Sequence, residues 1–140
     1  MMRNLAVLGS VALLLVACGE AKSPAPTEGA AARTEMEAAT KAFAECISGQ
    51  AETMALTEEP AGTLAINAVK ACAEPRAALV EKVAAFNKIG YPNRTEPQLN
   101  AVAEASVKIL EDEARQAAVV TIVKRQNENA PGAPAPATEG

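Results

Sequence analysis

The sequence predicts an all-α fold, a small up-down bundle of three long helices, and three observations support this prediction. The middle of the 140-residue chain is rich in Ala and poor in β-branched residues. Its apolar residues recur at three- and four-residue steps, without the alternation typical of strands. Capping and turn residues divide this pattern into segments that can fold back on one another.

The composition restricts both the core and the chemistry. With one Tyr, two Phe and no Trp, the core must consist mainly of Ala, Val, Leu and Ile. The chain has no His, which removes the commonest general base and the commonest metal ligand. A formal net charge of −4 without a basic patch gives nucleic-acid binding no electrostatic support. We therefore expect no enzymatic activity, no cofactor, no metal and no nucleic-acid partner.

Residues 1–17 have the features of a secretory signal peptide. Arg3 gives a positive start, and the run from Leu5 to Ala17 is apolar apart from Ser10. This run of 13 residues is too short to span about 30 Å of hydrocarbon as a helix, so it fits a signal peptide better than a membrane-spanning segment.

The residues Leu15-Val16-Ala17-Cys18 resemble the lipobox of bacterial lipoproteins. The resemblance implies cleavage between Ala17 and Cys18, a thioether-linked diacylglycerol on Cys18, and usually a third acyl chain on the new amino group. Each buried methylene contributes about 0.8 kcal/mol, so two or three chains hold a protein durably at a membrane. Gly19 occupies the place where Asp signals inner-membrane retention in enteric lipoproteins, and it favours the outer membrane. The expected location is therefore the cell envelope, lipid-anchored and facing the periplasm.

Two stretches are predicted to lack regular structure. Residues 18–33 mix Pro, Ala, Ser, Gly and charged residues without apolar periodicity, and we interpret them as a flexible tether. Residues 129–140 have a similar composition and are predicted to form a disordered tail. The predicted helical bundle therefore covers residues 34–128.

The first helix is predicted to start at Thr34 and to end near Leu56. Thr34 and Glu37 have the spacing of a capping box. Gly49 lies inside this segment and costs about 1 kcal/mol relative to Ala, so a local irregularity is expected there. The apolar face is formed by Met36, Ala39, Phe43, Cys46 or Ile47, Gln50 and Met54.

The second helix is predicted to follow a turn at residues 57–60, where Pro60 is tolerated in a first helical turn. Pro75 removes a backbone donor, so we expect a kink or break near residues 73–74, and a break would give the bundle four helices in place of three. Residues 90–93, Gly-Tyr-Pro-Asn, should stop this helix. The last helix begins at a second capping box, Thr95 with Gln98, and continues to residues 124–125.

Cys46 and Cys72 are predicted to form a disulfide bond. They are equally distant from residue 59, inside the predicted turn, so they face each other in an antiparallel helix pair. Facing positions on closely packed helices meet the required Cα separation of about 4.4–6.8 Å, and an exported protein can oxidise. Closing this loop should stabilise the fold by about 3 kcal/mol. An alternative is that the two cysteines are buried and unbridged. A redox-active pair is disfavoured because the chain has no Cys-x-x-Cys motif and no His, and a metal site is disfavoured because His is absent.

The acidic run at residues 111–113 has the residue types of a cation site or an acid–base pair. Three consecutive helical residues point in three directions, so a solvated face is the favoured interpretation.

The segments at residues 43–46, 57–60 and 71–73 are similar to small exported two-cysteine helical proteins of Gram-negative bacteria. They read Phe-Ala-Glu-Cys, Thr-Glu-Glu-Pro and Ala-Cys-Ala. The similarity covers about 30 residues and implies no activity. It supports the helical hairpin and the disulfide.

The favoured function is a non-catalytic structural or protein-interaction module, bound to the membrane through Cys18 and able to contact an envelope protein. The alternative is a small-molecule or lipid carrier with an apolar pocket of at least about 300 Å³ between helices.

Overall fold

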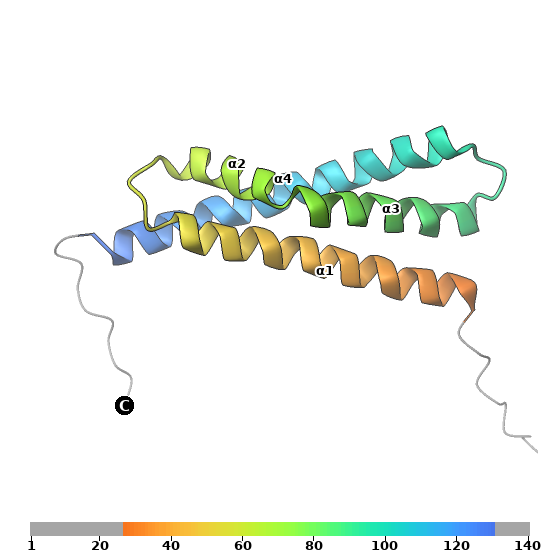
Figure 1. Cartoon of the computed structure of the whole chain (residues 1–140), viewed down its shortest axis with the longest axis horizontal. Helices are drawn as coiled ribbons and strands as arrows, with labels where there is room; N and C mark the ends of the chain where they lie inside the picture. The colour runs from red at the N-terminus through yellow and green to blue at the C-terminus, as the bar shows by residue number, and fades with distance from the viewer. Residues whose placement is uncertain (1–26, 131–140) are drawn as a thin grey trace, which may run out of the picture.

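The computed structural model describes residues 27–130 and contains four helices joined by short turns over that range. The helices are α1 (Glu28–Met54), α2 (Ala61–Ala71), α3 (Ala73–Gly90) and α4 (Glu96–Glu128). α1 runs along the length of the molecule, α2 and α3 follow one another back along it, and α4 returns in the direction of α1 (Figure 1). The all-α class is confirmed, while the expected count of three helices is replaced by four.

The fourth helix arises because the predicted second helix is divided at Cys72. Cys72 leaves helical geometry at φ −99° and ψ 30°, and α3 begins at the next residue. Pro75 then lies in the first turn of α3, where its missing N–H leaves no hydrogen bond unmade. Arg76 N–H donates to the Cys72 carbonyl at 3.1 Å, which begins the new hydrogen-bond series. The expected break near Pro75 is therefore present.

The predicted start of the first helix at Thr34 is wrong. α1 begins at Glu28, and the Thr27 hydroxyl caps it by accepting from Ala30 N–H at 3.3 Å. Thr34 lies inside the helix, and its hydroxyl donates to the Ala30 carbonyl at 3.1 Å. The segment 28–33, assigned to the tether, is helical because it has an N-cap, an acid in the first turn and a run of Ala.

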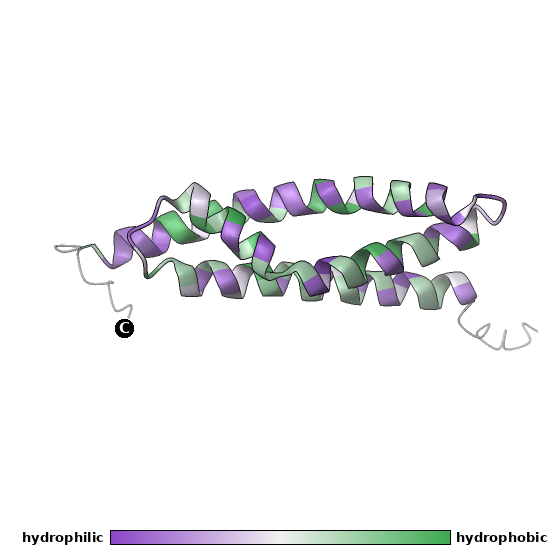
Figure 2. Cartoon of the chain, turned by 45° about the horizontal axis from the view of Figure 1, so that its top comes forward, coloured by the Kyte–Doolittle hydropathy of each residue, from purple (hydrophilic) through white to green (hydrophobic). Residues whose placement is uncertain are grey.

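The other predicted boundaries agree closely with the structure. α1 ends at Met54, α3 ends at Gly90, and the capping box of Thr95 and Gln98 begins α4. α1 continues through Gly49 as one helix, so the irregularity expected there is absent. Every helix carries both hydrophobic and hydrophilic residues (Figure 2), as expected for helices with one buried side.

The core lies between α1, α4 and the two middle helices, and small side chains form much of it. Six buried Ala residues are less than 4% exposed, which brings helix backbones close together. The largest fully buried side chains are Phe43, Ile47, Leu79, Leu99, Ile122, Val107 and Cys72.

Candidate functional site

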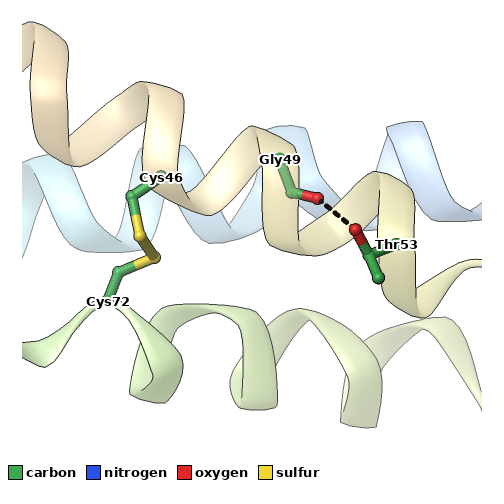
Figure 3. The surroundings of a disulfide bond; sticks show 4 residues. All are labelled: Cys46, Gly49, Thr53 and Cys72. Atoms are coloured by element: carbon green, nitrogen blue, oxygen red, sulfur yellow. Dashed lines mark hydrogen bonds between the residues drawn. A yellow bond between two sulfur atoms is a disulfide. The ribbon is translucent and has the colours of Figure 1, made fainter.

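The predicted cysteine pair joins α1 to the junction between α2 and α3. The Cys46 and Cys72 sulfur atoms are 2.02 Å apart, and their Cα atoms are 6.0 Å apart (Figure 3). Cys72 is fully buried, and Cys46 packs at the edge of the core. One turn further along α1, the Thr53 hydroxyl donates to the Gly49 carbonyl at 3.0 Å (Figure 3). Bonded sulfurs offer neither a thiolate nucleophile nor a metal ligand, so this pair acts as a cross-link.

A cluster of charged side chains joins α3 to α4. Arg76 Nε donates to Glu111 Oε2 at 2.7 Å, and Arg76 Nη2 donates to Glu104 Oε2 at 2.9 Å. Lys108 Nζ donates to Glu111 Oε1 at 2.9 Å and to Asp112 Oδ1 at 3.1 Å. Side-chain exposure is 28% for Arg76 and 16% for Glu111, so the centre of the cluster is shielded from solvent.

The contacts in this cluster favour the charged forms of its members. The hydrogen bond from Lys108, followed by that from Arg76, lowers the pKa of Glu111 below its ordinary value, although burial opposes this shift. The hydrogen bond from Lys108 likewise lowers the pKa of Asp112. The hydrogen bonds to Glu111 and Glu104 raise the pKa of Arg76.

This arrangement suits structure better than acid–base chemistry. A general acid needs a carboxyl pKa near the working pH, and the shifts here lie in the opposite direction. No group of three His, Cys, Asp or Glu side chains within residues 27–130 is placed to hold a metal ion. The acidic run at residues 111–113 is thus only partly a solvated face, because two of its three members are ion-paired.

A groove of about 600 Å³ lies between the first turns of α1 and the last turns of α3. It is open to solvent along its length, so it is a surface feature and not an enclosed cavity between helices. Its lining combines apolar and charged side chains, namely Glu28, Ala31, Ala32, Glu35, Ala85, Lys88, Ile89 and Pro92.

The two ends of the bundle present different surfaces. One end, which we call the tether end, contains the start of α1 and the turn of residues 91–95 (Figure 1). Tyr91 is 53% exposed there, and the Arg94 guanidinium lies over its ring at 4.3 Å from the centroid. The opposite end, which we call the far end, contains the turn of residues 55–60 and the end of α4 (Figure 1). Its turn carries two carboxylates beside Leu56, which is 74% exposed.

α4 also exposes apolar side chains along its outer face. Val102, Ile109 and Val120 are separated by 7 and 11 residues, which places them within roughly 20° of one direction on a helix. Ile109 is 63% exposed and Val120 is 69% exposed. We call these three residues, together with Val123, the α4 outer face.

The residues with the strongest functional prediction lie outside the described part of the chain. The lipobox residues 15–18 and Gly19 are among them, and the predicted signal peptide and the predicted tail from residue 131 onward also lie outside the described residues. Within residues 27–130, no helix combines the length and apolarity needed to cross a bilayer.

Sequence reasoning did not predict the charged cluster or the α4 outer face. Arg76 and Glu111 are 35 positions apart, so nothing local in the sequence connects them. The outer face was detectable in principle, because Ile109 and Val120 lie off the stripe that forms the core.

Comparisons of the chain with known protein families, with curated proteins and with solved structures found no match.

Proposed function

We propose that this chain is an envelope lipoprotein that is anchored by lipid on Cys18 and holds a non-catalytic helical module at the periplasmic face of a membrane. The observation that carries the proposal is the sequence Leu15-Val16-Ala17-Cys18 directly after a short apolar leader. Gly19 favours the outer membrane as the location. The absence of His from the chain supports a non-catalytic role.

Expression of the full chain in a Gram-negative host supplied with alkyne-palmitate tests the anchor. We expect labelled protein whose intact mass corresponds to a chain beginning at Cys18 plus its acyl groups. The Cys18→Ala variant should remain unlabelled and keep its leader. A labelled Cys18→Ala chain, or an unlabelled wild-type chain, would contradict the proposal.

The α4 outer face supports a role in protein contacts. Exposed Val and Ile side chains in one line offer a helical partner an apolar strip about 30 Å long, from the rise of 1.5 Å per residue between Val102 and Val123. A photo-crosslinking residue placed at Ile109 in the anchored protein should form one discrete adduct with an envelope protein. Lys41, exposed on α1, is the matched control position. Equal adducts from both positions would argue against this face.

A lipid or small-molecule carrier is the second candidate, and the groove at the tether end is the observation that favours it. Its volume of about 600 Å³ exceeds the lower size of ligand pockets. Its three charged side chains and its openness count against burial of an apolar ligand. If the carrier role holds, Ala85→Trp should abolish binding of a fluorescent fatty acid, and Ala117→Trp on α4 should leave binding unchanged.

A further inference from the structure

We propose that the tether end of the bundle rests on the headgroup layer of the anchoring membrane, with Tyr91 and Arg94 as its contact residues. This inference rests on the proposed lipid anchor at Cys18. It adds an orientation and a second, non-covalent contact with phospholipid.

The chain connection keeps one end of the bundle near the bilayer. Eight residues lie between Cys18 and Thr27, and the nine steps of 3.3–3.6 Å along the chain limit the Cα separation of the two residues to about 32 Å. α1 has 27 residues and is about 40 Å long, so the far end is held much less closely. A short connection raises the effective concentration of the tether end at the membrane surface, and modest contacts suffice to hold it there.

The exposed side chains of the tether end have the chemistry of a membrane interface. Tyr91 combines an apolar ring with a hydroxyl group, a residue type enriched at the headgroup level. Arg94 stacks on that ring and does not take part in any of the ion pairs found among residues 27–130. Its guanidinium is therefore available for a phosphate group. Ile89, 40% exposed, adds an apolar side chain beside this pair.

The turns at the two ends also differ in charge, and this difference favours contact of the tether end with anionic lipids. The turn of residues 91–95 contains Arg94 and no acid, and nearby Lys88 is neutralised by Glu96. Glu28 places an acid in the first turn of α1 at the same end, so the contact depends on Tyr91 with Arg94 and not on a strongly basic surface. The turn of residues 55–60 carries Glu58 and Glu59 and no cation, so anionic lipids would repel it.

The only Tyr of this Trp-free chain is Tyr91, so its fluorescence reports on the tether end alone. The lipidated full chain is reconstituted into phosphatidylethanolamine–phosphatidylglycerol vesicles with and without phospholipid brominated near the headgroup. Because interfacial tyrosines lie at the headgroup level, we expect the brominated lipid to reduce Tyr91 emission by at least about twofold. The Leu56→Tyr/Tyr91→Phe variant carries its single Tyr at the far end and should keep its emission.

The Arg94→Gln variant should lose most of the quenching while keeping its acyl mass and its helical content. Equal quenching at both ends, or no quenching at either end, would overturn the inference while leaving the anchor intact. A chain recovered from the membrane fraction without acyl mass would overturn the anchor and this inference together. Quenching that persists unchanged in Arg94→Gln would remove Arg94 from the contact.

Discussion

α2 and α3 follow one path along α1, yet different interactions hold them in place. α2 has 11 residues, a single charged side chain, Lys70, and a buried side formed by Leu64, Ala65 and Ala68. A helix of this length is marginal in isolation, so it depends on packing and on the cross-link at its end. α3 has 18 residues, and its cations pair with acids on the neighbouring segments.

Because of this difference, we expect different solution conditions to destabilise α2 and α3. A reducing agent breaks the Cys46–Cys72 bond at the end of α2 but leaves the ion pairs of α3 unchanged. Acid protonates the carboxylates around Arg76 and leaves the disulfide unchanged. Reduction should therefore destabilise α2 selectively, and acid should destabilise α3 selectively.

Removal of the disulfide should have the largest effect. In Cys46→Ala/Cys72→Ala, the free energy of unfolding by urea should fall by about 3 kcal/mol, because the unfolded chain regains the entropy of an open loop. Amide hydrogen exchange should accelerate more in α2 than in α3. Reduction of the wild-type protein is the control and should reproduce the loss. Equal acceleration in both helices would show that the disulfide does not stabilise α2 selectively.

Loss of Arg76 should have the next largest effect. Arg76→Gln removes a cation from Glu111, a carboxylate that is only 16% exposed, and should cost about 1.5 kcal/mol in urea unfolding. The matched control is Arg33→Gln, which breaks an exposed pair with Glu37 on α1 and should cost about 0.3 kcal/mol. Hydrogen exchange in Arg76→Gln should accelerate in α3 and not in α2. Similar losses in the two variants would show that the charged cluster adds little stability.

The charged cluster should also make stability depend on pH. The folded state lowers the pKa of Glu111 below the ordinary value of 4.5, so its contribution is complete above that pH. As pH falls through the lowered folded-state pKa, this contribution is lost. The melting temperature should therefore decline below about pH 4.5, and Glu111→Gln should lack part of that decline.

The pH dependence of the cysteine variant tests whether the disulfide and the charged cluster stabilise the fold independently. Cys46→Ala/Cys72→Ala keeps Glu111 and its partners, so its melting temperature should be lower at every pH with the same acid decline. A flattened decline in this variant would show that the disulfide positions the charged cluster, and the two helices would then not be independent.

Features that depend on residues adjacent in the sequence were predictable. Pro75 at a helix break, Gly90 at a helix end and the Thr95–Gln98 capping box depend on neighbouring residues alone. The Cys46–Cys72 pairing was predictable because a single turn makes the two positions equidistant. The start of α1 was missed because Pro-rich composition outweighed a local signal, the cap at Thr27 followed by Glu28 and three Ala residues.

Features that depend on contacts between helices were not predictable. The position of Arg76 opposite Glu111 depends on the rotation of α3 about its own axis, which no local sequence pattern specifies. The position of the segment that follows α3 beside the start of α1 likewise requires the path of α3 along α1 (Figure 1).

The smallest expected effect concerns the turn that precedes α2. Gln126 Nε2 on α4 donates to the carbonyls of Thr57 at 3.0 Å and Glu59 at 2.9 Å. Both bonds are exposed, so Gln126→Ala should cost only about 0.5–1 kcal/mol, with faster exchange confined to this turn and the first turn of α2. Asn127→Ala, one position further on α4, is the control and should change neither quantity. α2 has no ion pairs of its own among the described residues. In the cysteine variant the disulfide at the end of α2 is also gone, so the loss of unfolding free energy caused by Gln126→Ala should be larger there. A loss that stays the same in both backgrounds would mean that apolar packing alone holds α2 in place.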